Sequence, residues 1–270
     1  MYKSKRIAVV VPALNEQEHI AATLQGIPPY VDRVYVVDDA STDCTADIVR
    51  QLIAQHNTDR PVATRGWCPG TRIELVQHTR NHGVGAAIVS GYKRSLANQM
   101  DIVAVMAGDN QMDAQQLTHL LDPIAAGQAD YVKGDRLSRP EHLTGMSPLR
   151  RCGNRLLGCL TRVATGNSSI NDPQNGYTAI SSALLIDLPL DRLYPRYGYC
   201  NQLLAWVTAH QGRLIEVPMP SRYLGERSGI RYSTYIPRVF MLLLRLFITR
   251  LASPCTTLRL RRHLRFLSRG

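Results

Sequence analysis

Short apolar runs and longer segments of mixed polarity alternate along the first half of the chain. Four runs rich in β-branched residues predict strands: 7–11, 34–39, 73–77 and 102–106. Three segments between them predict helices: 16–26, 41–53 and 83–97. The segment 56–71 contains proline, glycine and polar residues and is expected to be a loop. This rhythm predicts an α/β fold, with an open, mostly parallel sheet and helices on both faces.

The rhythm changes after residue 135. The expected elements are a basic amphipathic helix, a polar loop, a strand or short helix, a helix and a strand, at 149–165, 170–176, 179–186, 199–210 and 214–217. Neither an internal repeat nor a clear linker is visible in the sequence. We therefore expect one domain over residues 1–235, followed by a basic amphipathic C-terminal segment over residues 236–270.

The net charge of +11 is concentrated near the C-terminus, where the residues from Arg222 onward include many arginines and a single acid, Glu226. Such asymmetry favours an anionic partner: a nucleic acid, a phospholipid surface or a phosphorylated substrate. A solvated basic surface would show the same pattern. Aromatic residues make up 6% of the chain and no nucleic-acid-binding module is recognisable, so we do not expect a nucleic-acid partner.

Signals for secretion and for membrane spanning are weak. No run reaches the roughly 18–20 apolar residues of a transmembrane helix, and the N-terminal apolar run is too short for a signal peptide. The segment 235–251 mixes apolar residues with Arg238, Arg245 and Arg250, which predicts a helix at a membrane interface, or one packed on its own domain or on a partner subunit. We expect the scattered cysteines to be reduced thiols. We expect a cytoplasmic protein, peripheral on the cytoplasmic face of a membrane.

Carboxylates follow two of the predicted strands. Asp38 and Asp39 end the second strand, and Asp43 follows shortly after. Neighbouring carboxylates repel one another unless a cation or hydrogen-bond donors compensate them. One of them could accept hydrogen bonds from a nucleoside base or ribose; alternatively, the cluster caps a helix and forms a turn.

The fourth strand leads into a second polar cluster. Asp109, Gln111 and Asp113 offer oxygen ligands suited to magnesium or manganese with bound phosphates. A divalent ion would neutralise the charge of a diphosphate leaving group. Acidic loops after strands are common, so an ordinary loop is the alternative.

A glycine-rich turn precedes the helix at 83–97. Gly83 and Gly85 suggest a dinucleotide fingerprint, but Ile88 stands where the third glycine would be, and the turn follows the third strand instead of the first. We therefore expect these glycines to allow close approach of the backbone to the helix and to a nucleotide.

Five motifs occur in an order that resembles glycosyltransferase family 2. They are VVVPALNE (9–16), VVDDASTD (36–43), RNHGVGAA (80–87), GDNQMD (108–113) and DPQNGYTA (172–179). Within that family the sequence is most similar to dolichyl-phosphate and undecaprenyl-phosphate sugar synthases, over residues 6–236. The resemblance implies a Rossmann-like GT-A fold and inverting transfer of a sugar from a nucleotide sugar to a polyprenyl phosphate.

The resemblance also implies donor-site residues. The nucleoside-binding positions of the family fall on Pro12, Ala13, Asn15, Glu16 and Asp39. Asp109 and Gln111 match positions that hold the diphosphate and a magnesium or manganese ion. The usual D-x-D motif of the family begins with Ala107 here, so one usual acidic ligand is absent and metal dependence stays open.

Four arginines match phosphate-binding positions of the family. Arg136 corresponds to an arginine presented to the acceptor phosphate, and Arg151 belongs to a second basic cluster there. Arg227 and Arg231 lie in a loop that clamps the donor diphosphate in the family, with Arg231 where lysine is usual. Each of these arginines could instead be a solvated surface residue.

The expected reaction is attack of a lipid phosphate oxygen on the sugar anomeric carbon. Phosphate needs no strong base, because its second pKa is about 6. Asp172 could orient the acceptor, act as a base if the acceptor were a hydroxyl, or stabilise its loop. The alternatives are a glycosyltransferase acting on a saccharide or glycolipid hydroxyl, and a degenerate protein that binds a nucleotide sugar without catalysis.

Overall fold

The computed structural model describes residues 1–58, 72–143, 148–220 and 232–252. The strands are β1 (Ile7–Ala13), β2 (Arg33–Asp38), β3 (Ile73–Gln77), β4 (Ile102–Val105), β5 (Tyr131–Asp135), β6 (Thr178–Ser181) and β7 (Leu214–Pro218). The α-helices are α1 (Ile20–Gly26), α2 (Thr45–Thr58), α3 (Val84–Ala97), α4 (Leu117–Ala125), α5 (Pro148–Thr165), α6 (Ser182–Leu185), α7 (Tyr199–Ala209) and α8 (Tyr232–Ala252). Short 3-10 turns lie at Ala114–Gln116, Pro140–Leu143 and Leu190–Arg192.

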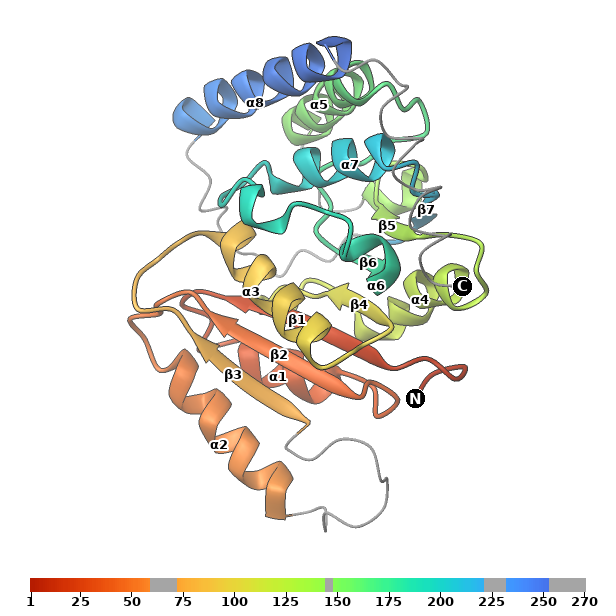
Figure 1. The fold of residues 1–270 in the computed structure, drawn as a ribbon. Helices are drawn as coiled ribbons and strands as arrows, with labels where there is room; N and C mark the ends of the chain where they lie inside the picture. The colour runs from red at the N-terminus through yellow and green to blue at the C-terminus, as the bar shows by residue number, and fades with distance from the viewer. Residues whose placement is uncertain (59–71, 144–147, 221–231, 253–270) are drawn as a thin grey trace.

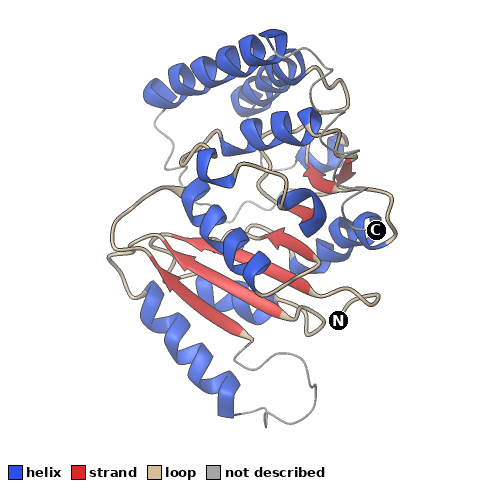
Figure 2. Cartoon of the chain, viewed as in Figure 1, coloured by secondary structure: helices blue, strands red, loops and turns tan. Residues whose placement is uncertain are grey.

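The strands form one open sheet in the order β3-β2-β1-β4-β6-β5-β7. Every neighbouring pair is parallel except the two that involve β6, which runs antiparallel to both β4 and β5. Helices flank the strands in Figure 2. The predicted α/β fold, with a mostly parallel open sheet, is confirmed.

Alternate residues of the central strands supply two hydrophobic cores. Val9 and Val11 of β1 pack with α1, α2 and α4, whereas Val10 packs with α3, α6 and α7 on the opposite face. A strand buried on both faces needs a continuous apolar run, which explains the composition of 7–11. Gly91 of α3 lies against Val10, and a larger side chain there would overlap the valine methyl groups.

Helices α5 and α8 lie side by side at the end of the molecule farthest from α2 (Figure 1), and both also contact α7. Val239 and Leu243 of α8 pack with Ala164 of α5. The expected boundary after residue 235 falls inside α8, and a division of the chain there remains a prediction. None of the described helices combines the length and the apolar content needed to cross a bilayer.

Three expected elements have other bounds in the structure, and the apolar pattern predicted neither α4 nor β5. The helix expected over 16–26 begins at Ile20; residues 17–19 form a turn, and the amides of Glu16 and Gln17 donate to the side chains of Thr45 and Asp43. Helix α2 continues to Thr58, into the segment expected to be a loop. The segment 179–186 is both a strand and a helix, since Ser181 ends β6 and caps α6 through its hydroxyl.

A buried lysine and a half-buried glutamate lie side by side where β5 pairs with β7. Lys133 and Glu216 are register partners, and the fully buried Lys133 donates through Nζ to the Asn175 carbonyl. One Glu216 oxygen accepts from the Asn171 amide at 2.8 Å, and the other is buried without a hydrogen-bond partner among the described residues. Burial lowers the pKa of Lys133 and raises the pKa of Glu216 to about 7. This pair therefore lies beneath the loop that precedes β6.

Replacing Glu216 with glutamine should stabilise the protein at pH 8. The carboxyl group ionises near pH 4.5 in the unfolded chain but near pH 7 in the fold, so its contribution to stability is lost as the pH rises through that window. We expect Glu216→Gln to gain on the order of 1–2 kcal/mol in free energy of unfolding at pH 8 compared with pH 5. Urea unfolding at both pH values measures this, with Glu18→Gln as an exposed control. An equal effect at the two pH values would contradict the assignment.

Candidate active site

A cleft of about 1040 Å³ opens at the carboxyl ends of β1, β2 and β4. The loops after these strands, the start of α3, the loop before β6, the start of α7, and helices α5 and α8 form its walls. Open α/β sheets bind ligands at this edge. Seven of the predicted site residues line this one cleft: Pro12, Ala13, Glu16, Asp39, Asp109, Gln111 and Arg136.

Asp39, directly after β2, is held by donors on both of its oxygens. Oδ1 accepts from the His82 amide at 2.9 Å and lies 2.7 Å from Nδ1 of His78, while Oδ2 accepts from the Gly83 amide at 2.6 Å. Nε2 of His78 lies 2.9 Å from the Ser90 hydroxyl. We assign the Nδ1–H tautomer, because it lets His78 donate to Asp39 and accept from Ser90. The carboxylate is thereby fixed at the cleft wall and ties β2 to the start of α3.

Asn15 joins the first two loops of this edge. Its amide donates to Ser41 Oγ at 2.9 Å, and its Oδ1 accepts from the Thr42 amide at 2.8 Å. Asn15 also has a positive φ of 56°, a conformation that asparagine tolerates well. It does not line the cleft. Its observed contacts hold the loops after β1 and β2 together, and its direct contact with a nucleoside remains a prediction.

The glycines at the start of α3 allow another part of the chain to come close. A side chain at Gly83 or Gly85 would overlap the carbonyl oxygens of Pro195 and Tyr194, and the Ala86 amide donates to the Pro195 carbonyl. Gly83 also has a φ of 98°, which disfavours other residues. The glycine-rich turn therefore positions the segment before α7 over the cleft.

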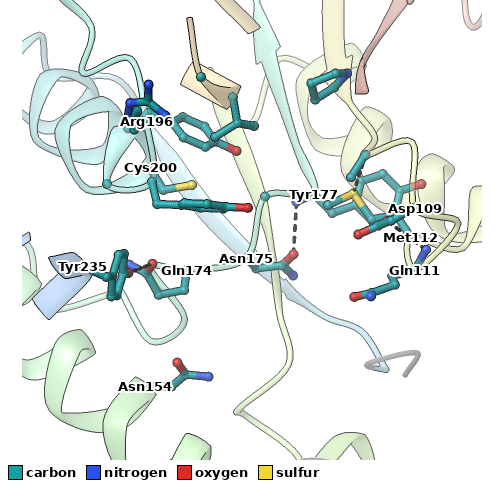
Figure 3. A pocket seen from close by; sticks show the side chains of 18 of the residues that line it. Asp109, Gln111, Met112, Asn154, Gln174, Asn175, Tyr177, Arg196, Cys200 and Tyr235 are labelled. Atoms are coloured by element: carbon teal, nitrogen blue, oxygen red, sulfur yellow. Dashed lines mark hydrogen bonds between the residues drawn. The ribbon is translucent and has the colours of Figure 1, made fainter. Parts of the chain in front are cut away.

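The loop after β4 brings oxygen-bearing side chains to the cleft (Figure 3). Asp109 Oδ1 accepts from the Gln111 amide at 3.1 Å, and Asp113 accepts from the Gln115 amide. Within the described ranges, no three His, Cys, Asp or Glu side chains gather into a complete metal cage. Magnesium in phosphate-transfer sites takes one or two carboxylates together with phosphate and water oxygens. The residues present thus fit a metal ion whose coordination is shared with a diphosphate.

Arg136 and Asp172 form a two-point ion pair beside the cleft. Nε of Arg136 donates to Oδ2 at 2.7 Å, and Nη2 donates to Oδ1 at 3.0 Å. The Asp172 side chain is 0% exposed, whereas Arg136 is 17% exposed and lines the cleft. Burial alone would raise the pKa of Asp172, but the charge and hydrogen bonds of Arg136 lower it. An ionised Asp172 therefore holds the guanidinium group in one orientation at the cleft wall.

The remaining predicted arginines are placed differently. Arg151 is half-buried, does not line the cleft, and donates to the Leu143 carbonyl at 3.4 Å. Arg227 and Arg231 lie outside the described residues. The phosphate-binding roles of all three remain predictions.

The other end of the cleft is apolar and was not predicted from the sequence. Helices α5 and α8 supply its side chains: Leu156, Leu157, Leu160, Ile236, Val239, Phe240 and Leu243. The segment before α7 adds Arg196, and α8 adds Tyr235, which donates to Gln174 (Figure 3). The three-to-four-residue spacing of the apolar positions was the available signal, but it does not show which helices will face each other.

Comparison with a solved structure supports the fold. Glucosyl-3-phosphoglycerate synthase from Mycobacterium tuberculosis, solved with Mn²⁺, uridine diphosphate and glucosyl-3-phosphoglycerate, aligns with a TM-score of 0.62. The alignment covers 93% of this chain and 81% of that one, at 22% sequence identity. At this identity the likeness establishes the GT-A-like fold alone.

Sequence comparisons agree with the family resemblance. The UDP-N-acetylglucosamine–dolichyl-phosphate N-acetylglucosaminyltransferase of Methanococcus voltae is 26% identical over 220 residues, covering 81% of this chain and 86% of the relative. The undecaprenyl-phosphate mannosyltransferase of Micrococcus luteus is 27% identical over 227 residues, covering 82% and 86%. The sequence profile of "Glycosyl transferase family 2" matches residues 8–188. Since this match spans more than half of the chain, we conclude that the protein is a glycosyltransferase that belongs to glycosyl transferase family 2.

Proposed function

We propose that this glycosyltransferase moves a sugar, with inversion, from a nucleoside-diphosphate sugar to a polyprenyl phosphate. The acceptors named for two relatives, dolichyl phosphate and undecaprenyl phosphate, support this choice. The observation that carries the proposal is the Arg136–Asp172 pair. A guanidinium group fixed by a buried carboxylate at a cleft wall is well suited to orient a phosphate.

The same pair argues against a hydroxyl acceptor that uses Asp172 as its base. A sugar hydroxyl needs a base that can reach and accept its proton. Asp172 is fully buried, both of its oxygens accept from Arg136, and its pKa is lowered. An acceptor phosphate is already largely ionised at neutral pH and needs no such base.

In the proposed reaction, an acceptor phosphate oxygen attacks the anomeric carbon while the bond from that carbon to the diphosphate breaks. The nucleoside is proposed to bind along Pro12, Ala13, Glu16 and Asp39 at the polar end of the cleft. Asp109 and Gln111 would hold a magnesium or manganese ion, which supplies charge neutralisation to the diphosphate when bound. Arg136 positions the attacking phosphate, so that catalysis relies on orientation and charge stabilisation.

The apolar end of the cleft is suited to the first units of a prenyl chain. It is formed by α5 and α8, and α8 also carries an exposed apolar stripe: Ile236, Phe240, Leu244, Ile248 and Leu251. Arg238, Arg245 and Arg250 are exposed on the same helix. We propose that this helix lies in the headgroup region of an anionic membrane, on the cytoplasmic face, where the lipid acceptor is held.

Arg136→Lys should impair acceptor use specifically. Lysine keeps the charge but loses the two-point geometry, so kcat/KM for the prenyl phosphate should fall on the order of 100-fold, with little change in the affinity for uridine or guanosine diphosphate. The assay is transfer from a panel of labelled nucleotide sugars to farnesyl and undecaprenyl phosphate.

A matched control exists for this substitution. Arg213 makes the same pattern of bonds to Asp130, at 3.0 Å through both Nε and Nη2, on an exposed surface. Arg213→Lys should leave transfer unchanged. If Arg136→Lys leaves turnover unchanged, Arg136 does not position the acceptor phosphate. If the wild-type protein transfers sugar only to saccharide hydroxyls, the proposed acceptor is wrong.

Metal binding should depend on Asp109 and on the diphosphate together. We expect Asp109→Asn to weaken Mn²⁺ binding at least about tenfold in the presence of uridine diphosphate, measured by electron paramagnetic resonance. Asp191→Asn, at a side chain 82% exposed, is the control. A chelator should also abolish transfer. Unchanged Mn²⁺ affinity in the Asp109 variant would place the metal elsewhere.

Membrane attachment should require the apolar stripe of α8. Replacing Leu244 and Ile248 with glutamate should reduce flotation with vesicles containing phosphatidylglycerol at least about tenfold, because two buried apolar side chains are lost from the interface. Ile186→Glu changes an isolated residue that is 63% exposed and should have no effect. Equal flotation of all three proteins would reject α8 as the membrane contact.

A further inference from the structure

A chain of side-chain hydrogen bonds joins three helices to the loop that holds Asp172. Tyr235 of α8 donates to Gln174 Oε1 at 2.6 Å, and Gln174 Nε2 donates to Asn201 Oδ1 of α7 at 2.9 Å. Asn201 Nδ2 donates to Thr161 Oγ1 of α5 at 2.7 Å, and the Thr161 hydroxyl donates to the Leu157 carbonyl. The Tyr235–Gln174 bond is drawn in Figure 3.

The chain has a single direction. Each hydroxyl or amide donates to the next member, so the orientations of the Gln174 and Asn201 amides are mutually consistent. Flipping either amide alone would place two acceptors or two donors against each other. Asn201 and Thr161 are fully buried. Gln174 and Tyr235 are half-buried. Hydrogen bonds in such a series strengthen one another, and the loss of one leaves a polar group without its partner, at a cost that grows with burial.

Gln174 is two residues from Asp172, and the loop between them is restrained from several sides. Pro173 stiffens the intervening backbone. A side chain at Gly158 of α5 would come within 2.9 Å of the Asn171 carbonyl, so α5 packs directly on the loop. Arg162 of α5 donates to the Ile170 carbonyl at 2.9 Å. Because the loop is held in this way, we expect a displacement of Gln174 to shift Asp172 as well.

We propose that Tyr235, Gln174 and Asn201 are positioning residues that set the Arg136–Asp172 pair and couple the seating of α8 to binding of the acceptor phosphate. The inference rests on the proposed function, because it assigns the acceptor phosphate to Arg136. Tyr235 and Gln174 line the cleft on the side of α8, next to its apolar end. The hydroxyl of Tyr235 is thus the point at which a helix proposed to contact lipid touches the loop behind the acceptor site.

The kinetic test uses the full-length protein with farnesyl phosphate and the best nucleotide sugar from the panel above. Tyr235→Phe removes one hydroxyl and keeps the ring; it should lower kcat/KM for farnesyl phosphate about fivefold, with the KM for the nucleotide sugar unchanged. Gln174→Met should lower kcat/KM for farnesyl phosphate further, and the double variant should be no worse than Gln174→Met alone, because the two residues act through one path.

Thr249→Val is the matched control on the same helix. Its hydroxyl donates to the Arg245 carbonyl one turn earlier in α8, outside the chain of bonds. This variant should leave acceptor kinetics unchanged. An unchanged kcat/KM for farnesyl phosphate in Tyr235→Phe, equal losses for donor and acceptor, or additive losses in the double variant would overturn the proposal.

A second measurement does not require turnover. Hydrogen exchange of a peptide spanning residues 170–177 should be several-fold faster in Tyr235→Phe than in wild type and unchanged in Thr249→Val, because the loop loses one of its tethers. If wild type transfers no sugar to any prenyl phosphate, the proposed function fails, while faster exchange still supports the coupling of α8 to the loop. Identical exchange in all three proteins would reject that coupling.

Discussion

The site depends on one constraint: strand β6 lies between β4 and β5 and runs antiparallel to both. Because β6 runs opposite to both neighbours, its first residue, Thr178, pairs with Val105 near the end of β4 and with Lys133 in β5. The loop before β6 therefore lies at the same edge as the loops after β4 and β5. A parallel strand in that place would bring its far end to this edge, and Asp172 could not meet Arg136.

The cleft that results has two chemically different ends. Its polar end is shaped by loops that Asp39 and Asn15 join through hydrogen bonds, several of them to backbone amides of neighbouring loops. Its apolar end is formed by α5 and α8, outside the repeating β-α part of the fold. Specific hydrogen bonds hold the polar end together, whereas the shape of the apolar end depends on how two helices pack.

Local pattern was sufficient for the first half of the fold. Continuous β-branched runs identified β1 to β4, because parallel strands buried on both faces need them. The acids that follow β2 and β4 indicated the edge of the sheet where the cleft lies. Strand β5 was harder to predict, because Lys133 and Gly134 interrupt its short apolar stretch. Its burial depends on pairing with β6 and β7. The predicted start of α1 was wrong: residues 17–19 form a turn, and the Glu16 and Gln17 amides bond to Thr45 and Asp43, contacts distant in sequence that the local pattern does not show.

Part of the site was also predictable from local sequence. Motifs identified Asp39, Asp109 and Arg136, which lie on loops that follow strands, and all three line the cleft. The pairing of Arg136 with Asp172, 36 residues apart, follows from sheet order and cannot be inferred from spacing. Tyr235 and Asn201 carry no motif that distinguishes them from ordinary helix residues. Their importance emerges from packing of α7 and α8 around one loop.

The one-way order of donors from Tyr235 to Thr161 also limits how this region can diverge. Gln174, Asn201 and Thr161 each donate one of these hydrogen bonds and accept another, so exchanging one side chain alone leaves a neighbouring polar group without its partner. Positions 161, 174, 201 and 235 are therefore expected to change in concert during evolution, as a set whose members sit on four separate stretches of sequence.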